Sequence, residues 1–127
     1  MMQYIGIPFK DGEPSFGGAN CITLVELFYR EELGIEIEPI RVDHDHKRRA
    51  FMQYLTEISE RWDALPEPEL YCVVAMAHSP KHPDLVQHFG IYLGDGIILH
   101  TLQNVGSHIV RLSKMKPFIK GYYKWRS

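Results

Sequence analysis

The sequence predicts an α+β domain, with helices in the N-terminal half followed by an antiparallel sheet. Two segments of the first half place apolar residues at helical spacing. The second half holds apolar runs of strand length, two of which flank a Gly-Asp-Gly turn. Helices that precede several sequential strands are typical of α+β folds, not of doubly wound parallel sheets. The chain has 127 residues, of which 45% are hydrophobic, so we expect a single domain over residues 1–127.

The first predicted helix covers residues 21–33 and follows a loop rich in glycine and proline at residues 5–20. Asn20 is a suitable N-cap residue and Gly34 is suitable just after the last turn, so both ends carry a boundary signal. The apolar face has i, i+3, i+4, i+7 spacing and consists of Cys21, Leu24, Val25 and Phe28. The sequence therefore predicts an amphipathic helix that begins at Cys21.

A second helix is predicted over residues 44–64, where Pro66 and Pro68 end it. Its apolar face consists of Phe51, Tyr54, Leu55, Ile58 and Trp62.

The remaining elements are predicted to be strands. Residues 71–77 form a continuous apolar run, which indicates a strand buried on both faces. Residues 86–93 and 97–102 flank the turn and are predicted to form a hairpin. Weaker strand patterns cover residues 105–112 and 122–125.

Composition argues against several partners. The net charge is −2 and the pI is about 6.4, so we expect neither nucleic acid nor a membrane surface as a partner. The first residues lack a basic segment and a long apolar segment, so we expect synthesis in the cytoplasm without a signal peptide. Two cysteines, Cys21 and Cys72, do not make a disulfide framework.

Cys21 is the strongest candidate for chemistry because it opens the first helix. A helix N-terminus presents unpaired N–H groups and a partial positive charge, which favour thiolate over thiol. A thiolate there is a usable nucleophile, and the neighbouring amides could stabilise an oxyanion. Cys72 lies inside an apolar run and is predicted to be an inert core residue.

The hairpin carries two histidines that could serve such a nucleophile. A three-residue loop at 94–96 would pair Leu93 with Ile97 and set Gly90 opposite His100. His88 and His100 would then be diagonal neighbours on one face, one as general base and the other orienting it. A two-residue loop would instead place them on opposite faces. The other face, lined by Phe89, Ile91 and Leu93, would be the core face.

The other histidines are interpreted more simply. The spacings do not match a closed zinc site, so we expect no metal. His108 is predicted to be a surface strand position. The histidines weighed as metal ligands are His44, His46, His78 and His82.

Three sequence blocks, in order, resemble one family. They are Ile5-Gly-Ile-Pro-Phe-Lys, then Gly17-Gly-Ala-Asn-Cys-Ile-Thr-Leu-Val, then His88-Phe-Gly-Ile-Tyr-Leu-Gly-Asp-Gly, with His100 following. Together they resemble the NlpC family of papain-like cell-wall cysteine peptidases, and especially its short single-domain members from tailed bacteriophages. The resemblance covers nearly the whole chain, and it implies a papain-like fold with N-terminal helices packed on an antiparallel sheet.

The resemblance also implies an activity. Cys21 matches the nucleophile, His88 the general base and His100 the polar residue that orients it. The family cleaves peptidoglycan stem peptides, typically between D-glutamate and diaminopimelate, without metal or organic cofactor. In phages such domains look like tail-tip or tail-assembly proteins, so the implied partners are the peptidoglycan peptide and tail-tip proteins. The implied location is the virion tail, acting on the cell wall.

The sequence departs from the family pattern beside the nucleophile. Asn20 and Ile22 stand where the family has Asp-Cys-Ser-Gly or Asp-Cys-Trp-Gly, and Phe9 stands where many members have tyrosine. These three residues are the predicted substrate-binding positions. Two alternatives follow: a catalytically weak or inactive structural module of a phage tail tip, and another amidase or acyltransferase on the same fold.

Overall fold

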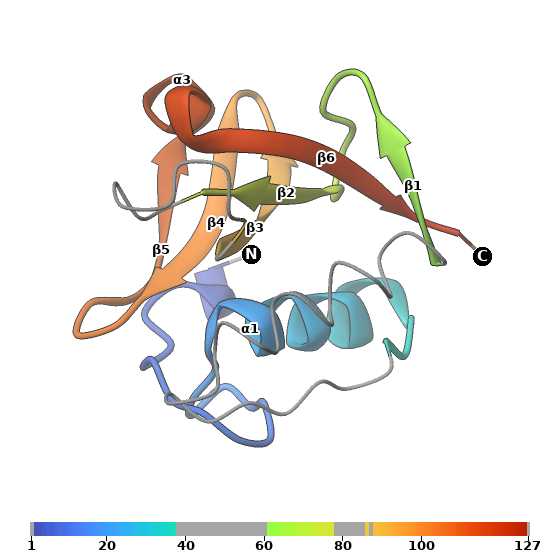
Figure 1. Cartoon of the computed structure of the whole chain (residues 1–127). Coiled ribbons are helices and arrows are strands. Elements are labelled where there is room, and N and C mark those ends of the chain that lie inside the picture. The colour runs from blue at the N-terminus through green and yellow to red at the C-terminus, as the bar shows by residue number, and fades with distance from the viewer. Residues whose placement is uncertain (1, 38–60, 78–85, 87, 127) are drawn as a thin grey trace.

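The computed structural model describes residues 2–37, 61–77, 86 and 88–126, which form one antiparallel sheet with a helix packed across it (Figure 1). Six strands of the described chain lie in the order β1-β6-β2-β3-β4-β5. The helical elements are η1 (Met2–Tyr4), α1 (Cys21–Phe28), η2 (Tyr29–Leu33), α3 (Leu112–Met115) and η4 (Lys116–Phe118). The strands are β1 (Trp62–Leu65), β2 (Val73–Met76), β3 (His88–Gly94), β4 (Ile97–Leu102), β5 (Gly106–Arg111) and β6 (Ile119–Trp125). The predicted α+β class is confirmed.

The helix that begins at Cys21 has the predicted bounds. Regular α-helix runs through α1, and a π-helical turn, η2, carries it to Leu33, where Gly34 takes the left-handed conformation with φ 65°. Asn20 caps the start, since its side-chain oxygen accepts from the amides of Ile22 and Thr23 at 3.0 and 2.9 Å. The Thr23 hydroxyl accepts in return from the Asn20 amide at 2.7 Å, which completes a capping box.

The predicted second helix is wrong at its C-terminal end. Most of it falls on residues 38–60, which lie outside the described residues, but β1 is a strand that pairs antiparallel with β6. Trp62 is 5% exposed and its ring meets that of Trp125 edge to face at 5.1 Å. Long-range pairing, the burial of Trp62 and its contact with the half-buried Trp125 therefore override the helical spacing that the local sequence suggests.

The β3–β4 hairpin turns through two residues, not three. Asp95 and Gly96 have φ of 53° and 73°, a type I′ pattern, so the predicted three-residue loop is wrong. Ile91 still pairs with Leu99, because the register shifts by one residue between Tyr92 and Gly94. This bulge absorbs the extra residue, and the predicted pairing in the body of the hairpin is kept.

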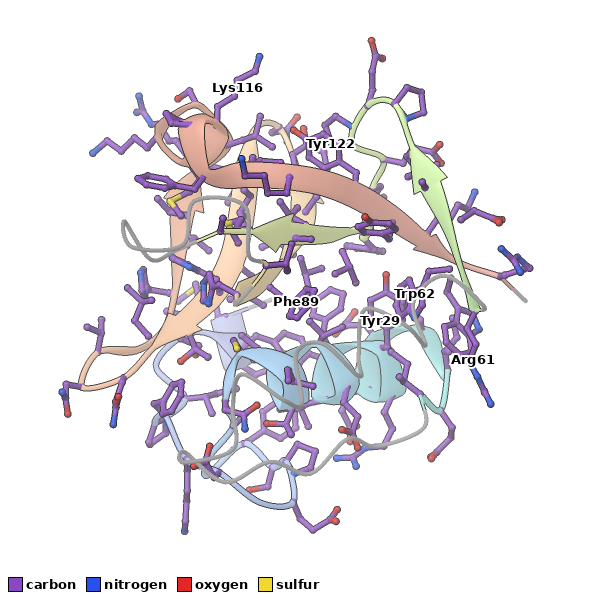
Figure 2. All side chains as sticks on the ribbon, in the orientation of Figure 1. Tyr29, Arg61, Trp62, Phe89, Lys116 and Tyr122 are labelled. Atoms are coloured by element: carbon purple, nitrogen blue, oxygen red, sulfur yellow. The ribbon has the colours of Figure 1, made fainter. Side chains whose placement is uncertain are left out.

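Both faces of the sheet are buried around β2, as its apolar run predicts. On one face the sheet packs against α1, and Figure 2 shows Phe89 pointing from the sheet toward the helix, with Tyr29 and Trp62 further along the same interface. On the other face a smaller cluster forms under α3 from Val74, Met76, Ile98 and Met115. Within the described residues no helix is long and apolar enough to cross a bilayer.

The N-terminal segment is held against the edge strand β5 by Ser107. Its hydroxyl donates to the Tyr4 carbonyl at 2.6 Å and accepts from the Ile7 amide at 2.7 Å. Its backbone amide donates to the Ile7 carbonyl and its carbonyl accepts from the Gly6 amide, both at 2.8 Å. The segment approaches so closely that a Cβ on Gly106 would lie 2.8 Å from the Ile7 oxygen.

Gly106→Ala is expected to destabilise the protein more than the matched change Gly12→Ala. Both glycines have positive φ, but a Cβ on Gly12 meets nothing within 4 Å. Gly12→Ala should therefore cost about 1 kcal/mol of backbone strain, and Gly106→Ala about 3 kcal/mol because it also pushes β5 from the N-terminal segment. Urea denaturation of both variants checks this. Equal losses of stability would contradict the close approach.

Candidate active site

Cys21 is the first residue of α1 and is 2% exposed. Its position at a helix N-terminus is the one the sequence predicts. The capping box has a chemical consequence, because the amides of Ile22 and Thr23 already donate to the Asn20 side chain. An oxyanion formed at Cys21 would need a hydrogen-bond donor other than these two amides. The sequence-based expectation that neighbouring amides stabilise the oxyanion therefore does not extend to Ile22 and Thr23.

The two hairpin histidines meet directly. His88 Nε2 and His100 Nδ1 are 2.8 Å apart, and the side chains are buried, with residue exposures of 4% and 2%. One nitrogen donates and the other accepts, so the hydrogen bond fixes the orientation of both rings. Since His88 uses Nε2 here, Nδ1 is the nitrogen with which it can exchange a proton with another group. This is the geometry of a base and its orienting residue.

The strand ends bring the histidine pair to the same end of the fold as the start of α1. His88 opens β3, and His100 lies in the second half of β4; because these strands are antiparallel, the start of β3 lies beside the end of β4. Helix α1 packs against both strands, and its N-terminal end lies under the arrowhead of β4 in Figure 1. The catalytic roles of Cys21, His88 and His100 stay predictions.

A third histidine adjoins the pair. His108 lies opposite His100 in the register of β4 and β5, with ring centroids 4.4 Å apart. Its Nδ1 lies 2.9 Å from the Gly106 carbonyl, which can only accept, so Nδ1 carries the proton. The residue is half-buried, not the plain surface position that the sequence indicated. The β4–β5 pairing is the signal that would have found it, and the sequence does not supply that register.

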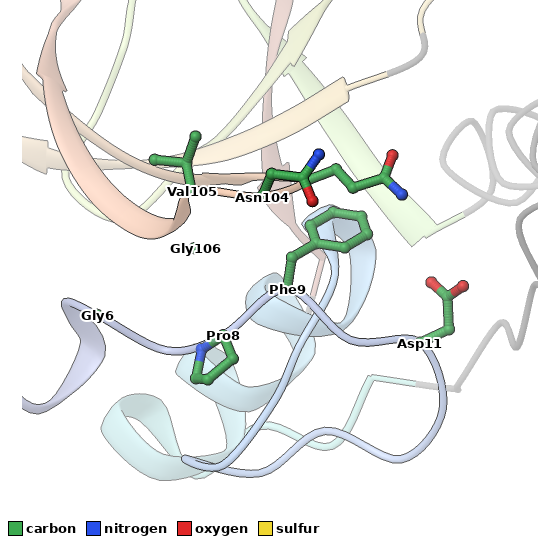
Figure 3. A pocket seen from close by; sticks show the side chains of 8 residues that line it. Gly6, Pro8, Phe9, Asp11, Asn104, Val105 and Gly106 are labelled. Atoms are coloured by element: carbon green, nitrogen blue, oxygen red, sulfur yellow. The ribbon is translucent and has the colours of Figure 1, made fainter.

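The predicted substrate-binding residues fall in three different environments. Phe9 is half-buried and lines an open cavity of about 650 Å³ between the N-terminal loop and the β4–β5 turn (Figure 3). Asn20 is buried and caps α1, and its Nδ2 donates to Asp11 Oδ1 at 3.1 Å. Ile22 packs in the core and is 4% exposed. The structure thus places Phe9 at a cavity, and substrate binding by all three stays a prediction.

The second cysteine does not join this arrangement. Cys72 is buried just before β2, and burial raises the pKa of its thiol, which agrees with the predicted inert core residue. His44, His46, His78 and His82 lie outside the described residues. Within the described ranges no group of three or more histidine, cysteine or acidic side chains could hold a metal ion.

Solved structures of known proteins share this fold. The NlpC/p60 domain of the peptidoglycan hydrolase SagA matches with a TM-score of 0.65 and 17% identity, over 97% of this chain and 91% of that one. NlpC1 from Trichomonas vaginalis matches with a TM-score of 0.66 and 16% identity, over 97% of this chain. An NlpC/p60 family protein from Bacillus cereus ATCC 10987 matches with a TM-score of 0.62 and 17% identity, over 96% of this chain. No protein-family model and no curated protein matches the sequence.

These matches show an NlpC/p60-like fold, a helix near the N-terminus packed on a six-stranded antiparallel sheet within the described residues. The resemblance seen in the sequence is confirmed to that extent. The match spans 41% of the T. vaginalis chain and 36% of the B. cereus chain, so those proteins contain further parts. Membership among bacteriophage tail proteins stays a prediction.

Alkylation by iodoacetamide is expected to separate the two cysteines. Cys21 should react well below the free-thiol pKa of roughly 8.5, because the helix N-terminus and His88 favour its thiolate. Cys72 should react slowly and only in alkaline solution, because a raised pKa lowers the thiolate fraction at any given pH. Mass spectrometry of labelled peptides over pH 5–10 gives both profiles.

The control for this experiment is His88→Ala, in which the Cys21 profile should move to higher pH while the Cys72 profile stays. A Cys21 profile that rises only near the free-thiol value, and is indifferent to His88, would mean an ordinary thiol.

His100→Leu is expected to remove the preference of His88 for one tautomer, because leucine cannot form the hydrogen bond to Nε2. The hydrogen bond to His100 is worth about 1 kcal/mol, a preference of about fivefold for one tautomer. Nitrogen-15 shifts of the His88 ring should show one dominant form in the wild type and a mixture in His100→Leu. His100→Asn, which keeps a polar atom near the position of Nδ1, is expected to restore much of the preference. Unchanged tautomer populations in His100→Leu would show that the pair does not orient His88.

Proposed function

We propose that this chain is a cysteine peptidase that hydrolyses amide bonds in peptidoglycan stem peptides. The observation that carries the proposal is the His88–His100 hydrogen bond, at the end of the fold where α1 begins with Cys21. The fold is that of NlpC/p60 domains, one of which belongs to the peptidoglycan hydrolase SagA. A nucleophile, a base and an orienting group are the parts that acyl transfer requires.

The reaction follows from these groups. The Cys21 thiolate attacks the peptide carbonyl, forming a C–S bond, and the C–N bond breaks as His88 gives a proton to the leaving amine. A water molecule then loses a proton to His88 and attacks the thioester, which releases the carboxylate and regenerates the thiol. His100 keeps the His88 ring oriented through both steps.

The sequence resemblance extends the proposal to a particular bond and setting. The bond is that between D-glutamate and diaminopimelate, and the setting is a bacteriophage tail that opens the cell wall. The protein would be made in the cytoplasm and would then be carried by the virion, with tail-tip proteins as its partners.

A second candidate is a structural module that keeps the fold without turnover. Two observations favour it: Cys21 is 2% exposed, and the Asn20 cap occupies the amides of Ile22 and Thr23.

Digestion of purified muropeptides distinguishes the two candidates. The peptidase should release fragments detectable by mass spectrometry, and Cys21→Ala and His88→Ala should lower the rate by about a thousandfold or more, because each removes a reacting group. Cys72→Ala, which changes the buried second cysteine, is the matched control and should keep activity. Hydrolysis that survives in Cys21→Ala would refute the nucleophile. An inactive wild type with an ordinary Cys21 thiol would support the structural module.

A further inference from the structure

The cavity that Phe9 lines has walls that are fixed by the chain itself. On one side, the Ala19 amide donates to the Pro8 carbonyl at 3.0 Å and the Lys10 amide to the Ala19 carbonyl at 3.2 Å, which holds the loop beside the start of α1. On the other side, the Ser107 hydrogen bonds fix the start of β5 against the same N-terminal segment. A site of about 650 Å³ is therefore formed before a ligand arrives, and its size lies within the range of small-molecule sites.

The described side chains that line the cavity are apolar or uncharged and polar, apart from one carboxylate. Phe9 contributes a ring, and Pro8 and Val105 contribute aliphatic groups. Gln103 and Asn104 contribute carboxamides and Asp11 contributes the carboxylate, and among the described lining residues there is no basic side chain. Figure 3 shows the Phe9 ring rising from the loop toward Asn104, with the Asp11 carboxylate further along the loop. An anionic ligand would find no counter-charge among these described residues, and an entirely apolar one would desolvate polar groups without replacing their hydrogen bonds.

The two carboxamides are available to a ligand. Within the described part of the chain the side chains of Gln103 and Asn104 make no hydrogen bond, and both residues are exposed. Each offers two donors and an acceptor. The turn that carries them is fixed, because the Val105 amide donates to the Leu102 carbonyl at 3.1 Å and Asn104 has φ 68°. Rigid donors and acceptors beside an aromatic face suit a pyranose ring, which has alternating hydroxyls and an apolar C–H face.

The cavity adjoins the candidate active site from two sides. Asp11 accepts from Asn20, the residue before Cys21, through the 3.1 Å hydrogen bond. Gly106, on the opposite wall, accepts the Nδ1–H of His108, whose ring packs on His100. A ligand in the cavity and a peptide bound at Cys21 would therefore lie next to each other.

We infer that this cavity binds a sugar residue of the glycan strand, so that the protein acts on stem peptides still attached to their glycan. The inference rests on the proposed function for the peptide, and adds a binding site for the sugar. Phe9 packs against the C–H face of the ring, while Gln103, Asn104 and the second oxygen of Asp11 bond to its hydroxyl and acetamide groups.

Three soluble ligands test this by NMR titration of the nitrogen-15-labelled wild-type protein. They are N-acetylmuramyl-L-alanyl-D-isoglutamine, the N-acetylated dipeptide without the sugar, and the dipeptide with a free amine. The muramyl ligand should bind about fivefold or more tightly than the N-acetylated dipeptide, as two or three added hydrogen bonds would give. The largest amide shifts should fall on Gly6, Asn104 and Gly106, which line the cavity.

Variants separate the cavity from the rest of the surface. Phe9→Leu and Asn104→Gly, the second of which tolerates the positive φ, should abolish the preference for the muramyl ligand. Phe118→Leu is the matched control on η4, outside the cavity lining, and should keep it.

Three results would overturn the inference. The first is equal affinity for the muramyl ligand and the N-acetylated dipeptide, and the second is no binding of the muramyl ligand. The third is tightest binding of the free-amine dipeptide, which would make Asp11 a binding site for its ammonium group. None of them depends on turnover, so failure of the sugar site is distinguishable from failure of the peptidase, which the muropeptide digestion measures separately.

Discussion

The bulge between Tyr92 and Gly94 is the constraint on which the candidate site depends. Side chains alternate between the faces of a strand, so a slip of one residue would move every side chain of β3 to the other face. A two-residue turn alone would separate His88 from His100 and expose Phe89 and Ile91. The bulge returns the register to the one in which the histidines share a face and the apolar residues remain in the core with α1. One extra residue thus links core packing to the histidine pair.

The Asn20 cap at the start of α1 affects both helix stability and the chemistry available at Cys21. Asn20 holds the first turn by accepting from two amides, and this cap fixes the position of Cys21. The same bonds use donors that an oxyanion would otherwise find there. Asn20 also donates to Asp11, so the loop that forms the cavity is connected to the first turn of the helix. Helix capping, nucleophile position and cavity shape therefore depend on one side chain.

The edge strand β5 contacts the N-terminal segment, the histidine pair and the cavity. Ser107 binds the N-terminal segment through four hydrogen bonds, which covers part of an edge that would otherwise be open to pairing. The next residue, His108, packs on His100, and the preceding Gly106 lines the cavity. A short strand at the sheet edge thereby connects the histidine pair with the proposed sugar site.

Features that depend on residues close together in the chain could be predicted from the sequence. The helix from Cys21 with its Asn20 cap, the doubly buried β2 and the hairpin that carries His88 and His100 were predictable, since periodicity, capping and turn residues act over a few positions. Three features could not be predicted and follow from long-range contacts: the strand at Trp62, the bulge beside Tyr92 and the position of His108 against His100. These depend on pairing partners distant in sequence, whose burial and register outweigh the local preferences that a single sequence displays.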